Sequence, residues 1–217
     1  MPTIFLSCVV SASMSIYAEL DEVALPFLTL DTEHIGHSGT VLIVCADPRM
    51  VAGANPPAPS RVQQLVTRIR TEPGRPYGLS PHVIAVTCPP RMVADNARQR
   101  QLVQQNIPVL AGASRIIIEA HNGCAGLAHF YKGRIERLLR QGSQTPYFEL
   151  QRQLLDRGIE RFAGRVAALT KRSLIVEANY VDFDSGGSVV EVTNVRTVEV
   201  GRTAAATDQG WSTPEAV

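Results

Sequence analysis

The sequence predicts an α/β fold with a mainly parallel β-sheet flanked by helices, an antiparallel edge strand and a C-terminal hairpin. Three short runs are nearly continuous in valine, isoleucine and leucine, which is typical of parallel strands covered on both faces. Stretches with apolar residues at helical spacing lie between these runs, so strands and helices alternate along the chain. A chain of 217 residues can bury roughly 70% of its unfolded surface around a single core.

Turn residues bound each of the expected strands. The three buried strands are predicted at residues 41–46, 82–87 and 115–120. A fourth β-rich run, at 174–183, is separated from a fifth, at 189–192, by the sequence Asp-Ser-Gly-Gly. Such a turn between two β-rich runs predicts an antiparallel hairpin. We therefore expect a single α/β domain over residues 1–200, of which 1–40 form an N-terminal arm, and a C-terminal tail over residues 201–217.

Helices are expected in the segments that connect the strands. Apolar residues at helical spacing follow Ser60, which can cap the helix that contains them: Val62, Leu65, Val66 and Ile69. This helix ends before Pro73. Asp95 begins a second helical stretch, and Pro108 begins a short third one because proline fits the first turn of a helix but not its interior. Two longer helices are predicted at residues 127–140 and 147–171.

Charge and hydropathy exclude several function classes. The 21 basic and 20 acidic residues give a formal net charge of +1, so no long-range field attracts nucleic acid or an anionic membrane. No window supplies the roughly 18 apolar residues that a membrane span needs. The four cysteines are widely separated and no secretory signal precedes them, so we expect a cytoplasmic protein with reduced thiols. The charged fraction of 19% lies below the typical figure of about 25% and favours some surface that is buried against another subunit.

Chemically active side chains follow the first and the third buried strand. Cys45, Asp47 and Arg49 come at the end of the first strand, and His121 and Cys124 come at the end of the third. The carboxyl ends of parallel strands share one edge of the sheet, where α/β folds bind their ligands. Because side chains alternate along an extended chain, Cys45 and Asp47 can emerge on the same side. The sequence therefore predicts that these five residues converge.

Two thiolates and one imidazole form a typical ligand set for Zn²⁺. With Cys45, His121 and Cys124 as ligands, the fourth coordination position stays open, as it does in catalytic zinc sites. The metal lowers the pKa of a water molecule in that position from 15.7 to about 7 and so creates a hydroxide nucleophile. We expect Asp47 to orient this nucleophile and Arg49 to keep the Asp47 carboxylate ionised.

These residues resemble the two sequence motifs of the β-class carbonic anhydrases. That family pairs a Cys-x-Asp-x-Arg segment after its first strand with a His-x-x-Cys segment after its third, and it binds zinc through two cysteines and a histidine. The five residues of this chain match those motifs one by one, and the resemblance extends over residues 41–192. It implies a zinc-dependent lyase that hydrates carbon dioxide reversibly to bicarbonate by zinc-bound hydroxide. It also implies a homodimer or a larger homo-oligomer with its sites near the subunit interface.

The chain departs from the family pattern at three places. Pro48 replaces a serine, and Ala125 precedes Gly126 where the family has two glycines. At the end of the second strand the family commonly shows Arg-Asn-Ala-Gly beside the site, whereas this chain has Thr-Cys-Pro-Pro-Arg from Thr87 onward. None of these changes removes a ligand, but a different pocket wall leaves open a second activity, the hydrolysis of carbonyl sulfide or carbon disulfide at the same site.

Cys88 supports a further alternative of another functional class. It also lies at the carboxyl end of a predicted strand, so it can supply a fourth ligand. A site of three cysteines and one histidine would be closed, and the protein would then be a non-catalytic protein with structural zinc. A buried core thiol is the ordinary interpretation of an isolated cysteine, but four matching residues at the two expected strand ends favour a metal site for Cys45.

Overall fold

The structure confirms an α/β fold with a mainly parallel sheet. In this computed structural model, the described residues are 28–29, 37–51, 59–73, 80–170 and 172–201. Their six strands form one sheet in the order β1-β3-β2-β4-β5-β6. The strand bounds are Leu28–Thr29 for β1, His37–Cys45 for β2, Ser80–Val86 for β3, Arg115–His121 for β4, Leu174–Phe183 for β5 and Val189–Val200 for β6.

The four central strands are parallel, and both edges of the sheet are antiparallel. β2 pairs in parallel with β3 and with β4, and β4 pairs in parallel with β5. β6 pairs antiparallel with β5 and forms the expected hairpin, whereas β1 pairs antiparallel with β3 at the other edge. The two-residue strand β1 lies within the segment that the sequence analysis assigned to an N-terminal arm. The last four residues of that arm, 37–40, belong to β2, whereas its residues 1–27 and 30–36 and the predicted tail from residue 202 lie outside the described residues.

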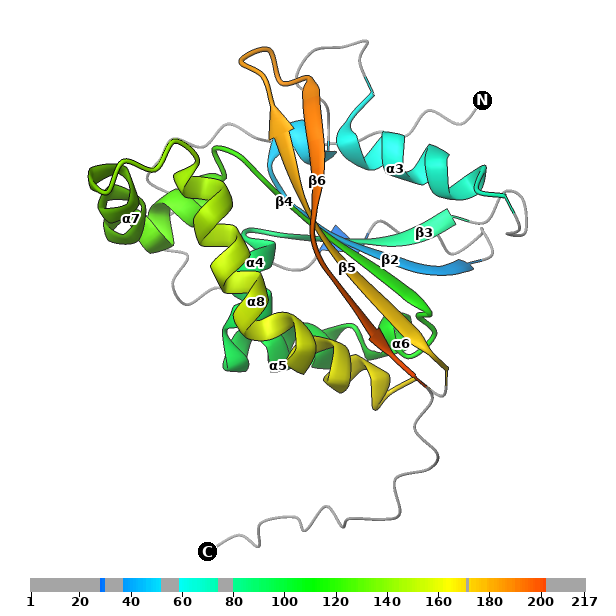
Figure 1. Ribbon diagram of the computed structural model, residues 1–217. Helices are drawn as coiled ribbons and strands as arrows, with labels where there is room; N and C mark the ends of the chain where they lie inside the picture. Colours follow the sequence, from blue (N-terminus) through cyan, green and yellow to red (C-terminus); the bar gives the residue numbers. More distant parts are fainter. Residues whose placement is uncertain (1–27, 30–36, 52–58, 74–79, 171, 202–217) are drawn as a thin grey trace, which may run out of the picture.

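The helices cover both faces of the sheet, with α3 on one side and α5 and α8 on the other (Figure 1). Their bounds are Pro48–Val51 for α2, Arg61–Arg70 for α3, Pro89–Ala94 for α4, Asn96–Gln105 for α5, Ile107–Leu110 for α6, Ala125–Arg140 for α7 and Pro146–Ala167 for α8. Within the described residues, no helix is both long and apolar enough to cross a membrane.

The helix starts follow the predicted capping residues. Ser60 accepts a hydrogen bond from the Gln63 backbone N–H at 3.2 Å, and the Gln63 side chain accepts one from the Ser60 N–H at 2.7 Å, which completes a capping box before α3. Asp95 caps α5 by accepting from two backbone N–H groups. Pro108 lies in the first turn of α6, as expected.

Three helix boundaries differ from the predictions. α8 begins at Pro146, one residue earlier than predicted, and ends at Ala167, four residues before the predicted end at residue 171, and α7 begins two residues earlier than predicted. The sequence pattern predicts no helix between residues 87 and 95, where the structure has α4. The two prolines after Cys88 lie at the start of α4, where the missing backbone N–H groups need no partner. α4 packs closely on α8. Glycine at position 158 allows this contact, because a Cβ atom there would collide with the Val93 carbonyl oxygen.

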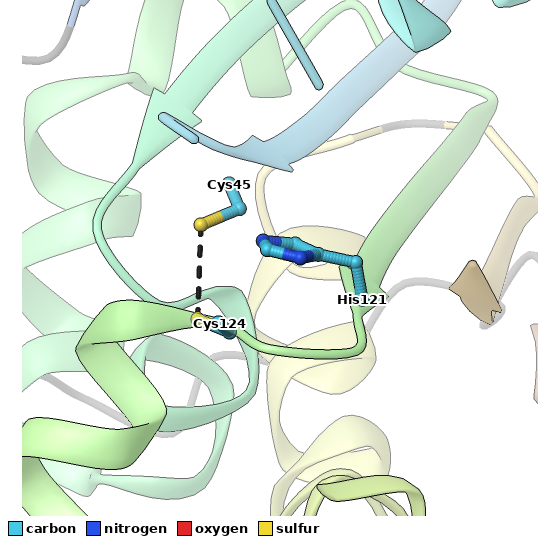
Figure 2. A group of neighbouring side chains, drawn as sticks. All are labelled: Cys45, His121 and Cys124. Atoms are coloured by element: carbon cyan, nitrogen blue, oxygen red, sulfur yellow. Dashed lines mark hydrogen bonds between the residues drawn. The ribbon is translucent and has the colours of Figure 1, made fainter. Parts of the chain in front are cut away.

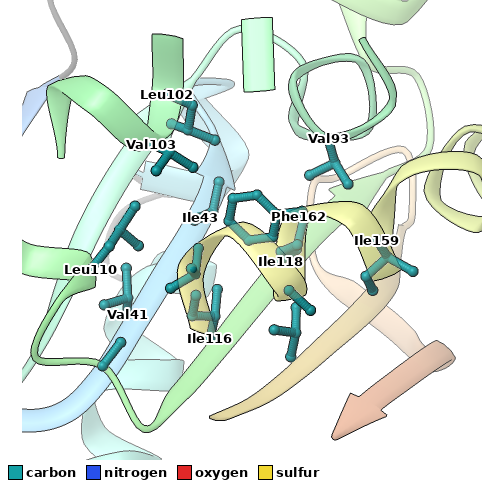
Figure 3. Close-up of a cluster of buried hydrophobic side chains, with 14 of the residues drawn as sticks. Val41, Ile43, Val93, Leu102, Val103, Leu110, Ile116, Ile118, Ile159 and Phe162 are labelled. Atoms are coloured by element: carbon teal, nitrogen blue, oxygen red, sulfur yellow. The ribbon is translucent and has the colours of Figure 1, made fainter. Parts of the chain in front are cut away.

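Alternating side chains of the central strands build two cores on opposite faces of the sheet. Val41 and Ile43 of β2 contribute to the core under α5 and α8, in which Phe162 is the largest fully buried side chain (Figure 3). Leu42 and Val44, the alternate residues of the same strand, contribute to the core under α3. Both faces are therefore covered, as nearly continuous apolar strands require, and the carboxyl ends of β2, β3 and β4 share one edge.

Candidate metal centre

The three predicted ligands lie together at the carboxyl edge of the sheet. Cys45 is the last residue of β2, His121 is the last residue of β4, and Cys124 is the N-cap of α7 (Figure 2). β2 and β4 are neighbours in the sheet, so their last side chains come close although they are distant in sequence. The ligand atoms of all three residues lie within 4.8 Å of one another, and all three residues are buried. This group could hold a metal ion.

The spacing of the two sulfur atoms fits a tetrahedral metal. Sγ of Cys45 and Sγ of Cys124 are 3.8 Å apart, and both cysteines are free thiols. Two Zn–S bonds of about 2.3 Å at the tetrahedral angle place their sulfur atoms about 3.8 Å apart. The backbone therefore holds the two thiols at the separation that such an ion needs.

His121 presents its Nε2 atom for coordination. Nδ1 lies 2.7 Å from the carbonyl oxygen of Asn122, and since a carbonyl can only accept, Nδ1 carries the hydrogen. Nε2 then carries the lone pair, and it is buried without a hydrogen-bond partner among the residues that the structure describes. A buried polar atom with no partner is costly, and a bound metal would satisfy it. Histidine ligands of metals commonly donate their second N–H to a backbone carbonyl in this way.

The thiols share their protons unequally. The pKa of Cys124 is lowered because the thiols of Cys45 and Cys88 form hydrogen bonds with its sulfur. The pKa values of Cys45 and Cys88 are raised well above the usual value, first by their hydrogen bonds with Cys124 and then by burial. The three thiols are therefore coupled, and their hydrogen bonds favour ionisation of Cys124 over that of the other two. A divalent cation would make the second thiolate stable as well.

Asp47 and Arg49 form a two-point ion pair beside the ligands. Arg49 donates from Nε to Oδ1 of Asp47 at 2.9 Å and from Nη2 to Oδ2 at 3.0 Å. Burial alone would raise the pKa of Asp47, but the hydrogen bonds from Arg49 and the nearby His121 lower it below the usual value. Oδ2 of Asp47 also lies 3.9 Å from Nε2 of His121. The structure therefore holds an ionised carboxylate next to the predicted metal position.

Two glycines allow the loop from β4 to α7 to adopt this shape. Gly123 lies between the ligands with a φ of +62°, a conformation that strains other residues. A Cβ atom at Gly126 would lie 2.6 Å from the Thr87 carbonyl oxygen and 3.2 Å from Cβ of Cys88. Only glycine at position 126 therefore lets α7 approach the end of β3 and bring Cys124 towards Cys45.

Cys88 lies beside the ligand group and does not belong to it. It is buried at the N-cap of α4 and interacts with Cys124. Among the described residues, the group with ligand atoms within mutual reach contains only Cys45, His121 and Cys124. In this geometry three described residues, and not Cys88, could together hold a metal ion.

Several residues that the sequence did not single out support the site. Asn122 bonds the backbone of Phe183, and Gln151 of α8 donates to the His121 carbonyl oxygen at 2.7 Å. Glu119, also on β4, is fully buried and forms a two-point ion pair with Arg61. A glutamate directly after three isoleucines of a buried strand is a usable signal, because a charged side chain is almost never fully buried unless it is paired. The partner of that charge cannot be found from sequence spacing.

Comparisons with known proteins do not identify a family. No protein-family model matches the chain, and no curated protein matches it at a significant level. The five matching residues of the two motifs lie together at one edge of the sheet. Membership of the β-class carbonic anhydrases stays a prediction from those motifs.

Proposed function

We propose that the protein is a zinc-dependent carbonic anhydrase that interconverts carbon dioxide and bicarbonate. The observation that carries this proposal is a buried group of three candidate ligands among the described residues, Cys45, His121 and Cys124, with an ionised carboxylate at its side. Three protein ligands leave one coordination position for water, which is the arrangement of a catalytic zinc site. The resemblance to the β-class family favours carbon dioxide as the substrate.

Zinc is the metal that the ligand chemistry favours. Thiolate sulfur and imidazole nitrogen suit Zn²⁺, whereas Mg²⁺ and Ca²⁺ prefer oxygen ligands. Two thiolates and one neutral imidazole balance the charge of a divalent ion, which allows the ion to be buried. When bound, zinc would supply a Lewis acid that lowers the pKa of a coordinated water to about 7.

The residues of the chain would orient the reactants around that position. Oδ2 of Asp47 faces the ligand group, so it would accept a hydrogen bond from the attacking water and direct its lone pair towards the substrate. Arg49 holds both oxygens of Asp47, so the carboxylate cannot turn away and stays ionised. The side chains of Asp47 and Arg49 are 14% and 27% exposed, so this pair lies on the side of the site that solvent reaches.

Two alternatives use the same residues. Carbonyl sulfide and carbon disulfide are linear electrophiles like carbon dioxide, and the same nucleophile would hydrolyse them. A closed site with Cys88 as fourth ligand would instead be structural. Cys88 interacts with Cys124, but it is not one of the described residues whose ligand atoms all lie within 4.8 Å of one another, and this supports the open site. A cytoplasmic location and a homo-oligomeric state also stay predictions.

A stopped-flow assay with a pH indicator tests the proposed activity. Zinc-loaded protein should hydrate carbon dioxide, and Asp47→Asn should retain its zinc and lose most of this activity. Asp156→Asn is a matched control, because Asp156 is an exposed residue that pairs with Arg196 on the surface. Fully zinc-loaded wild-type protein that fails to hydrate carbon dioxide would contradict the proposal. Hydrolysis of carbonyl sulfide in a parallel assay would then identify the alternative enzyme.

A further inference from the structure

Asn122 lies in the loop between β4 and α7 that carries His121 and Cys124, here called the ligand loop. It joins this loop to the hairpin of β5 and β6. Its backbone N–H donates to the Val181 carbonyl oxygen at 3.2 Å. Its side-chain Nδ2 donates to the carbonyl oxygen of Phe183 at 2.7 Å, and its Oδ1 accepts from the Phe183 N–H at 3.1 Å. The amide thereby imitates the backbone of one more strand residue and continues the pairing of β4 with β5 beyond the end of β4.

The backbone of Asn122 contacts the residues of the metal centre. Its carbonyl oxygen accepts from Nδ1 of His121 at 2.7 Å and from Nη2 of Arg49 at 3.3 Å. The first bond fixes which nitrogen of His121 carries the hydrogen. The second bond helps to fix the position of the Arg49 guanidinium, which donates hydrogen bonds to Asp47. One peptide carbonyl therefore orients both a predicted ligand and the predicted catalytic pair.

The Phe183 side chain completes this connection from the hairpin. Its ring meets the His121 ring edge to face, with centroids 5.9 Å apart, and the Arg49 guanidinium lies 5.3 Å from its centre. Phe183 is only 5% exposed. The position of this ring depends on the Phe183 backbone, which the Asn122 amide holds at two points.

We propose that Asn122 is a positioning residue of the metal centre, which locks the hairpin to the ligand loop and so sets the orientation of His121 and Arg49. This inference rests on the proposed zinc site. Asn122 acts through other residues, since its side chain bonds the Phe183 backbone and its carbonyl oxygen is the group that faces the centre. Partners of metal ligands in other proteins contribute about 10- to 100-fold to metal affinity, and a comparable contribution is expected here.

The substitution Asn122→Asp tests the inference with little change in size. A carboxylate still accepts from the Phe183 N–H, but it loses the donor and repels the Phe183 carbonyl oxygen. We expect zinc affinity, measured by competition with a chromophoric chelator, to fall about 10- to 100-fold. The visible absorption bands of the Co²⁺-loaded variant should also shift, because they report ligand geometry at the metal.

Asn194→Asp is the matched control. Asn194 lies on the same hairpin and donates from Nδ2 to Asn179 at 3.0 Å, so the change removes the same kind of hydrogen bond from a residue outside the centre. Its zinc affinity and its Co²⁺ spectrum should equal those of wild type. Should Asn122→Asp fail to fold, Asn122→Ser gives the same comparison without adding charge.

The outcomes separate this inference from the proposed function. If wild-type protein binds zinc, and the folded Asn122 variant binds it equally well with an unchanged Co²⁺ spectrum, Asn122 has only a structural role and the inference is wrong. A lower melting temperature of the metal-free variant with unchanged affinity leads to the same conclusion. If wild-type protein binds no zinc, the proposed function fails and the inference fails with it.

Discussion

The sulfur atoms of Cys45 and Cys124 lie 3.8 Å apart although the two residues are 79 positions apart in the sequence. Two features of the fold produce this contact. β2 and β4 are parallel neighbours that end at the same edge, and Gly126 lets α7 start close to the end of β3. The separation is that of two ligands of one tetrahedral ion rather than that of a disulfide.

Metal content should depend on Cys124 and not on Cys88. Purified protein should contain about one zinc per chain, Cys124→Ser should lose most of it, and Cys88→Ser should retain it. Both cysteines are N-caps of helices, and serine is a favoured N-cap, so neither change should prevent folding. Elemental analysis of the folded variants measures the effect. Equal zinc loss in both variants would favour the closed site with four protein ligands.

The fold was predictable from sequence because its signals are local. Runs such as Val41–Val44 show burial on both faces, and caps such as Ser60 show where a helix begins. The convergence of the ligands was predictable because parallel strands share their carboxyl edge. The supporting residues were not predictable in this way. Asn122 bonds a strand that lies 61 positions further along the chain, and such a pairing depends on the completed sheet.

The ion pair of Asp47 and Arg49 should make stability depend on acidic pH. The pKa of Asp47 in the folded protein lies below its unfolded value of about 3.9, so the carboxylate stabilises the fold fully above that unfolded value. This contribution is lost as the pH falls through the lower folded-state pKa. We therefore expect the difference in unfolding free energy between wild type and Asp47→Asn to be largest near neutral pH and to shrink below about pH 4. Urea denaturation of the metal-free proteins measures this difference, and a difference that grows as the pH falls would contradict the assignment.

Gly126→Ala should destabilise the protein and weaken metal binding together. The new Cβ would lie 2.6 Å from the Thr87 carbonyl oxygen, so α7 must move away from the end of β3, at a cost of about 1–3 kcal/mol. Cys124, at the start of α7, would move with it. Gly133→Ala is the control in the same helix, because nothing lies within 4 Å of a Cβ there, and alanine should stabilise the helix by about 0.5–1 kcal/mol. Thermal unfolding and zinc titration report the two effects. A Gly126→Ala variant as stable as wild type would show that α7 can adjust without loss.

Removal of one partner of the buried ion pair of Arg61 and Glu119 should lower the free energy of unfolding strongly. Replacement of both partners by apolar side chains should lower it much less. Glu119 is fully buried on β4, two residues before His121, and Arg61 bonds both of its oxygens at 2.7 and 2.9 Å. Glu119→Leu leaves the guanidinium buried without its partner, and we expect a loss of about 3–5 kcal/mol in unfolding free energy. The double change Arg61→Met with Glu119→Leu removes both charges and should recover most of that loss, because apolar side chains of similar volume can replace a buried pair. The exposed pair of Arg196 and Asp156 is the control, since Arg196→Met should cost less than about 1 kcal/mol. A double-mutant cycle in urea measures the coupling, and additive losses at positions 61 and 119 would show that the two side chains do not stabilise each other.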